Sequence, residues 1–249
     1  IESRITPRTI AEEFLDDPYW LGSSWLPSEE NDFQGIFPIW KEVLTRDFNL
    51  DSRLHNVVFT GSLGTGKTEI ATTVELYRLA LVTLLKRPQG FFGFKPGSNL
   101  VFNMLSVTKA AVTETGYGVA LDMMGRSPYF LEECRFNPDL KYTGFRVGLG
   151  NNIFLTAGSK GWHVLGRNVL CVFLDEGNFR NETDPDEKAY ELYNEVRNRI
   201  INRFLKLPGF MPAISILASS ARDESSFTET IMKEITEAKN EVLQRVYKF

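Results

Sequence analysis

A glycine-rich turn between an apolar run and a helical pattern constrains this chain more than any other feature. The turn is residues 61–68, GSLGTGKT, which fulfil the pattern G-x-x-x-x-G-K-S/T at every fixed position. The apolar run HNVVFT precedes it, and residues 67–85 carry an apolar stripe at helical spacing: Ile70, Val74, Tyr77, Leu81 and Leu84. We therefore expect a buried strand, a tight turn and a helix, in that order.

The residues of this turn give physical reasons for it to bind phosphate. Three glycines permit positive φ, so that amide groups converge on an anion, and the helix that starts at Gly66 or Lys67 adds the positive end of its dipole. Lys67 adds a full charge at the β- and γ-phosphates, and Thr68 offers a hydroxyl to Mg²⁺. A chance glycine turn before an ordinary helix is the alternative. We predict that ATP with Mg²⁺ binds the whole octet: Gly61, Ser62, Leu63, Gly64, Thr65, Gly66, Lys67 and Thr68.

Five short apolar runs alternate with helical patterns along the chain. They are rich in β-branched and aromatic residues, as is typical of parallel strands buried on both faces. The runs are residues 55–60, 99–105, 152–158, 168–176 and 213–220. The sequence therefore predicts an α/β fold with a central, mostly parallel sheet flanked by helices.

The domain organisation follows from length and local composition. The 249 residues fit one P-loop ATPase domain, residues 1–249. Residues 1–50 are rich in aromatics, prolines and acids, and we expect a helical extension packed on that domain. Residues 86–99, KRPQGFFGFKPGSN, predict a surface loop whose phenylalanines pack back onto the domain, or alternatively a contact site for a partner.

An acidic pair ends the fourth apolar run. In P-loop proteins the strand next to the phosphate-binding turn delivers an aspartate to Mg²⁺, and an adjacent glutamate can polarise the attacking water. We therefore assign Asp175 to the metal, together with Thr68, and Glu176 to the role of catalytic base. A polar strand end that turns at Gly177 is the alternative.

Small hydroxyl residues end the fifth apolar run. Ser219 and Ser220, followed by Arg222, could sense the γ-phosphate and relay its loss to the rest of the protein. Serines are also common at ordinary strand ends, so the coupling role and a purely structural one both stay open.

The charge pattern leaves room for one nucleic-acid contact. A net charge of −4 argues against a generally basic surface but not against a local basic patch. On the helix predicted for residues 187–206, Arg199, Arg203 and Lys206 line one face and suit contacts to a phosphate backbone, unless they form only a solvated face. Arg197 lies on the apolar side, where we expect a carboxylate partner.

Cysteines and hydropathy exclude two further classes. Cys134 and Cys171 lack metal-ligand spacing and are expected to be structural thiols. No apolar stretch is long enough for a membrane span, so no membrane association is expected.

In the order of these motifs the chain resembles the ATPase motor domain of a tailed-bacteriophage large terminase. Four blocks carry the likeness: residues 61–71, 104–130, 156–179 and 218–234. The resemblance implies a RecA-like P-loop NTPase fold of the ASCE type, with a glutamate beside the Mg²⁺ aspartate. It also implies ATP hydrolysis that drives viral double-stranded DNA into a procapsid in the host cytoplasm. The implied partners are the DNA, the portal ring, the small terminase subunit and further copies of this chain in a ring.

Such rings use arginines that reach a neighbour's active site. Arg167, in the turn before the acidic strand, is the first candidate for this catalytic role, with Lys160 and Arg146 next; an ordinary surface arginine is the alternative. The chain also departs from the family pattern. No arginine lies within the phosphate-binding turn, the adenine-contacting glutamine is not cleanly placed (Gln34 and Trp40 fall near it), and the C-terminal nuclease domain is expected to be absent.

Two other functions stay open from sequence. One is a nucleic-acid-dependent, helicase-like ATPase, although the chain has little room for a second lobe. The other is a nucleotide-gated DNA-binding protein in which hydrolysis is incidental.

Overall fold

A computed structural model shows an α/β fold built on a seven-stranded sheet. The strand order is β3-β4-β2-β5-β6-β1-β7, and every neighbouring pair is parallel except β3 with β4. The predicted fold class, a mostly parallel sheet flanked by helices, is confirmed. The structure describes residues 6–27, 35–106, 114–140, 146–158, 168–175, 186–204, 212–220, 227–238, 240 and 243–248.

All five predicted strands are present, and two edge strands add to them. The predicted strands are β1 (Asn56–Gly61), β2 (Leu100–Leu105), β4 (Ile153–Gly158), β5 (Asn168–Asp175) and β6 (Ile214–Ser220). The additional ones are β3 (Arg146–Gly148) and β7 (Gln244–Lys248). Both lie at sheet edges, where a strand needs less apolar sequence because part of it faces solvent.

The position of β5 corrects one expectation. The strand that ends in Asp175 was expected next to β1, but β6 lies between the two and pairs in parallel with both. The prediction of direct adjacency is therefore wrong. The order of strands in a parallel sheet depends on how the crossover connections pack, which the apolar runs do not encode.

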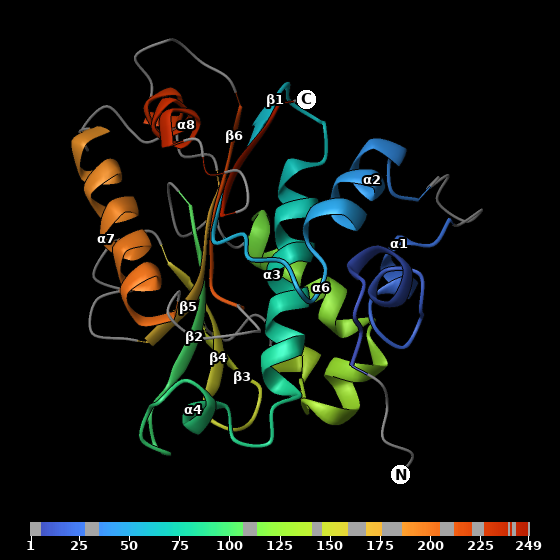
Figure 1. Cartoon of the computed structure of the whole chain (residues 1–249). Coiled ribbons are helices and arrows are strands. Elements are labelled where there is room, and N and C mark those ends of the chain that lie inside the picture. Colours follow the sequence, from blue (N-terminus) through green and yellow to red (C-terminus); the bar gives the residue numbers. More distant parts are fainter. Residues whose placement is uncertain are drawn as a thin grey trace.

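Helices cover both faces of the sheet (Figure 1). α7 and α8 lie on one face, and α3 and α6 lie on the other, with α1 and α2 outside them. None of the described helices has the length and apolar character that a membrane crossing requires. The helical elements are η1 (Ile10–Phe14), α1 (Gly22–Trp25), α2 (Pro38–Asp47), α3 (Lys67–Thr83), α4 (Pro88–Phe91), α6 (Gly116–Gly125), η3 (Tyr129–Glu133), η4 (Pro138–Leu140), α7 (Asp186–Phe204) and α8 (Phe227–Ala238).

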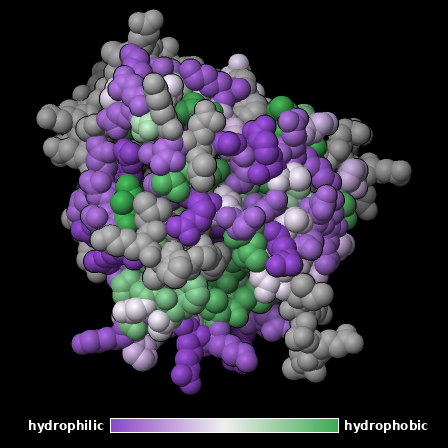
Figure 2. Space-filling view, in the orientation of Figure 1, coloured by the Kyte–Doolittle hydropathy of each residue, from purple (hydrophilic) through white to green (hydrophobic). Residues whose placement is uncertain are grey.

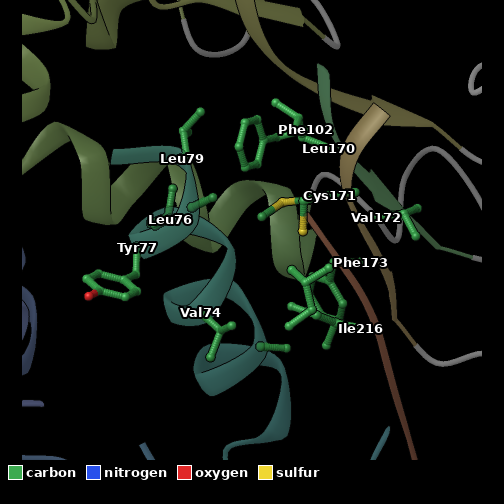
Figure 3. Packing of buried hydrophobic residues seen from close by; sticks show 14 of the residues in the cluster. Val74, Leu76, Tyr77, Leu79, Phe102, Leu170, Cys171, Val172, Phe173 and Ile216 are labelled. Carbon is green, nitrogen blue, oxygen red and sulfur yellow. The ribbon is translucent and has the colours of Figure 1, made fainter. Parts of the chain in front are cut away.

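α3 is the central helix of the core. Every residue from Ile70 to Val82 is buried, so the predicted one-sided apolar stripe is wrong for this helix. The sheet covers one side of α3, and α6 and η1 pack on it as well. Figure 3 shows the resulting cluster, in which α3 side chains such as Val74 and Leu76 lie near Phe173 and Ile216 of the sheet. Cys171 belongs to this cluster, and both it and Cys134 are buried free thiols, as predicted.

The described part of the first fifty residues packs on α3. The Tyr77 hydroxyl donates a hydrogen bond to the Pro7 carbonyl at 2.9 Å, and the Tyr77 ring meets Phe14 edge-on at 5.2 Å. Segments about 70 residues apart in sequence are thereby joined in the core. The elements η1, α1 and α2 are short and helical, as expected of this region.

Candidate functional site

The turn between β1 and α3 has a backbone conformation that depends on its glycines. Gly61, Gly64 and Gly66 have φ values of 143°, 76° and 79°, all in the region that favours glycine. α3 begins at Lys67, directly after Gly66. Its first amide groups lack partners within the helix and therefore face the turn, together with the positive end of the dipole. We call residues 61–68 the cradle.

Lys67 holds its charge inside the cradle. The residue is only 6% exposed. Its ammonium group donates to the Ser62 carbonyl at 2.5 Å, to the Thr65 hydroxyl at 3.3 Å and to the Gly61 carbonyl at 3.4 Å. The positive charge is therefore concentrated on the concave side of the turn, where an anion would enter.

Two oxygen-bearing side chains from distant parts of the sequence meet beside the cradle. The Thr68 hydroxyl donates to the Asp175 carboxylate, at 3.0 Å from one oxygen and 3.3 Å from the other. Asp175 ends β5 and is 2% exposed. A hydroxyl and one carboxylate match the oxygen ligands that Mg²⁺ takes from proteins, with water completing the shell. Across the described residues, no group of three or more histidine, cysteine or acidic side chains could hold a metal.

The tip of β6 lies between these two elements. Ser220 is in register with Gly61 of the cradle, Ser219 with Thr60, and Ala218 with Asp175. Both serines are buried. The predicted coupling residues therefore sit where β6 connects the cradle strand with the acidic strand.

A pocket of about 640 Å³ opens over the cradle. Beyond cradle residues, Trp25, Ile36, Phe37 and Val119 supply an apolar wall, and Glu114 and Thr115 supply polar groups. A nucleoside next to the cradle would lie against this wall, because flat aromatic bases favour apolar surroundings.

Trp40 contacts the cradle itself. Its indole N–H donates to the Thr65 carbonyl at 2.6 Å, and its ring is buried edge-on against Phe59 at 5.5 Å. The sequence pointed to Trp40 only as a neighbour of the adenine position. A contact between residues 25 positions apart carries no local sequence signal, so this role could not be found beforehand.

Several predicted site residues lie outside the described residues. They are the proposed base Glu176, the finger candidates Arg167 and Lys160, the coupling residue Arg222, the DNA candidate Lys206 and the adenine candidate Gln34. Arg146, the remaining finger candidate, is on the edge strand β3, with its guanidinium 3.6 Å above the Phe154 ring. Four strands lie between β3 and β1, so Arg146 cannot reach the cradle of its own chain.

The arginines of α7 already have partners within the chain. Arg199 forms a 2.8 Å ion pair with Glu195, and Arg203 donates to the Asn168 side chain at 2.7 Å. The expectation of a carboxylate partner for Arg197 is confirmed, because Arg197 lies 3.4 Å from Glu234. The predicted basic stripe is therefore partly neutralised on its own helix.

The sheet with its crossover helices is an α/β fold with a mostly parallel sheet between two layers of helices. Among solved structures, the chain is similar to the crystal structure of the HK97 bacteriophage large terminase, with a TM-score of 0.50 and 15% sequence identity. The match covers 86% of this chain and 39% of that chain, so the chain spans well under half of the terminase's length. The likeness confirms the predicted terminase-type fold. No family model matches the sequence, and no curated protein does.

Proposed function

We propose that this chain is the ATP-hydrolysing motor that drives viral double-stranded DNA into a procapsid. The observation that carries the proposal is the contact between Thr68 and Asp175 beside the cradle, because a hydroxyl and a carboxylate are the oxygen ligands that would suit an Mg²⁺ ion accompanying bound phosphates. The terminase-type fold supports the choice among ATPases. The portal ring, the small terminase subunit, a ring of identical copies and the host cytoplasm belong to the same proposal.

The residues divide the reaction among them. Cradle amides and the Lys67 ammonium bind the β- and γ-phosphates of ATP and stabilise the charge that grows on the transferred group. Thr68 and Asp175 would hold Mg²⁺, whose positive charge would offset the negative charge of the phosphates. Glu176 directly follows Asp175 and orients the attacking water.

A structural change caused by loss of the γ-phosphate would reach the sheet through β6, the strand that ends in Ser219 and Ser220. Ser219 and Ser220 pair with the strand that leads into the cradle, and their strand also pairs with β5. A small shift of the cradle would therefore displace β6, which lies between β1 and β5. Arg222 follows this strand and adds a charge that responds to the phosphate.

Two substitutions test the proposal, one through ATP binding and the other through ATP turnover. Lys67→Ala should weaken Mg-ATP binding about tenfold or more, because a buried charge–phosphate contact is lost. Glu176→Gln should keep Mg-ATP affinity but lower turnover by about 10²–10⁴-fold, because the base acts only on water. Binding is measured by calorimetry and turnover by phosphate release, with the exposed Lys233→Ala as control.

Each outcome decides between functions. Normal turnover in Glu176→Gln would remove Glu176 as the base, and unchanged binding in Lys67→Ala would remove the cradle as the ATP site. Binding without turnover, even with duplex DNA present, would favour a nucleotide-gated binding protein. Stimulation by single-stranded but not by double-stranded DNA would favour a helicase-like ATPase.

A further inference from the structure

Carboxylates are missing from several segments of an otherwise acidic chain. The sequence has no aspartate or glutamate from Leu76 to Thr113, and none in residues 146–158 or 168–174, although the net charge is −4. These segments include β2, β4 and β5 and the turns from which those strands start. Their exposed charged residues are all cations: Lys86, Arg87, Lys95 and Arg146.

The segment around α4 is fixed in place rather than loosely attached. Phe92 and Phe94 pack edge-on against Phe204, at 5.5 and 5.9 Å between ring centroids. The side-chain amide of Gln89, buried beneath the segment, donates to the Ser98 carbonyl at 3.2 Å and to the Asn151 carbonyl. The expectation that phenylalanines pack back onto the domain therefore holds for two of the three, while Phe91 is 42% exposed.

The same packing brings the end of α7 to this segment. Phe204 is the last residue of α7, and Arg203 precedes it. Arg203 donates to Asn168 at the start of β5, and Asn168 in turn donates to the Asn99 carbonyl at 3.1 Å. These contacts join the segment that carries Lys86, Arg87 and Lys95 to the end of α7, which carries Arg203, about a hundred residues later in the sequence. We call Lys86, Arg87, Lys95 and Arg203 the α4 basic surface.

The three cations that flank α4 lie at the surface of the protein. Lys86, Arg87 and Lys95 are exposed, and no described carboxylate lies within ion-pair distance of them. Figure 2 shows hydrophilic side chains projecting below an apolar area at the lower end of the molecule, where Figure 1 places α4. Exposed cations on a segment that Phe92, Phe94 and Gln89 hold in place fit a polyanion with a regular backbone.

We propose that the α4 basic surface binds the sugar–phosphate backbone of double-stranded DNA without reading its sequence. This inference rests on the proposed function, which makes duplex DNA the polyanion that the chain must grip. Of the α7 stripe it keeps only Arg203, since Arg199 is paired with Glu195, and it adds the three cations of the segment before β2.

The location also explains how nucleotide and DNA sites would communicate. β2 and β5 start at the α4 basic surface, and β5 ends at Asp175 beside the cradle. α3 runs the same distance in the opposite direction, from Lys67 in the cradle to Thr83, three residues before Lys86. Its 17 residues span about 25 Å as one rigid rod. A displacement of α3 at the cradle is therefore transmitted to the first cations of the surface.

The test neutralises the surface and compares it with an equal change elsewhere. The surface variant is Lys86→Gln, Arg87→Gln and Lys95→Gln combined. The control variant is Arg8→Gln, Lys41→Gln and Lys233→Gln, three cations in the N-terminal region and on α8. Binding of the full chain to a fluorescent mixed-sequence duplex is followed by anisotropy between about 50 and 200 mM salt. Mg-ATP affinity is measured in parallel.

The surface variant should lose duplex affinity about tenfold or more at low salt. Its plot of log affinity against log salt should become shallower by about 2–3, close to 0.9 for each phosphate contact removed. The control variant should keep most of the duplex affinity and most of the salt dependence. Mg-ATP affinity should be unchanged in the surface variant and in the control variant.

Other outcomes overturn the inference. Unchanged duplex binding in the surface variant would remove the surface, and an equal loss in the control would show an effect of net charge alone. Tighter binding of the wild-type chain to single strands or to anionic vesicles than to duplex would remove double-stranded DNA as the partner. Failure of the wild-type chain to bind Mg-ATP would instead count against the proposed function.

Discussion

Glu75 is a fully buried carboxyl group in the middle of α3. Burial raises the pKa of Glu75 from 4.5 to about 8, so the group keeps its proton at neutral pH. The Cys171 thiol of β5 lies beside it, and burial together with Glu75 raises the pKa of that thiol. Two neutral groups can thus share the core between α3 and the sheet, where an ionised carboxylate would be strongly destabilising.

Glu75→Gln should flatten the pH dependence of stability. From about pH 4.5 to about pH 8 the unfolded chain releases this proton while the folded chain keeps it. The free energy of unfolding of the wild-type protein should therefore fall as pH rises through this window, by about 1.4 kcal/mol for each pH unit. Urea unfolding at several pH values measures the slope. The exposed Glu132→Gln is the control, and equal slopes in both variants would show that Glu75 is not the responsible group.

The sequence allowed the position of some site residues to be predicted, but not the burial of Glu75. The contact between Thr68 and Asp175 could be anticipated, because Mg²⁺ chemistry demands these residue types at a turn and at a strand end. The roles of Lys67, Thr68 and Asp175 toward phosphate and Mg²⁺ stay predictions. Glu75 lies outside the apolar stripe that the sequence predicted for this helix. Its burial depends on elements that surround α3 and come from both ends of the chain, so no local pattern indicates it.

At the scale of elements, apolar runs predicted strands but not their neighbours. β1, β2, β4, β5 and β6 are buried throughout or nearly so, and this is why their sequences stand out. The insertion of β6 between β1 and β5 is a property of the assembled sheet. It separates the cradle strand from the acidic strand, which sequence reasoning had placed side by side.

The contact between α2 and the cradle is another property of assembly. A trans peptide directs its carbonyl and the following N–H to opposite sides. Because Trp40 holds the Thr65 carbonyl, the Gly66 N–H must point away from Trp40. Phe59 of β1 fixes the indole ring. α2 therefore orients one of the amides with which the cradle would hold phosphate, and Trp40 acts as a positioning residue.

Trp40→Phe should weaken nucleotide binding without changing base preference. The ring is kept, but the hydrogen bond that orients the peptide is lost, which is worth about 1 kcal/mol or about fivefold in affinity. Affinities for Mg-ATP and Mg-GTP should fall by the same factor, as calorimetry can measure. Trp20→Phe, a buried tryptophan outside the pocket, serves as control. A loss confined to ATP would make Trp40 a contact to the base instead.

At the scale of the whole molecule, the mouth of the pocket is unusually apolar for a free surface. Leu63 of the cradle is 74% exposed and Phe37 is 59% exposed, and both line the pocket over the cradle. Large apolar side chains at a rim are typical of surfaces that another protein covers. In the proposed ring, the neighbouring copy is the protein that would cover this mouth, and it could bring an arginine to the γ-phosphate.

Mixing two inactive variants tests this arrangement. Lys67→Ala removes the cation of a subunit's own cradle, and Arg167→Ala removes the candidate finger, whose loss costs about 10³-fold in turnover. If Arg167 acts on a neighbour, sites in the mixture can combine an intact cradle from one variant with Arg167 from the other. Phosphate release should then exceed the sum of the separate proteins, and wild-type turnover should rise faster than linearly with concentration. Additive rates together with strict proportionality would place all catalytic groups within one chain, because each copy would then complete its own site.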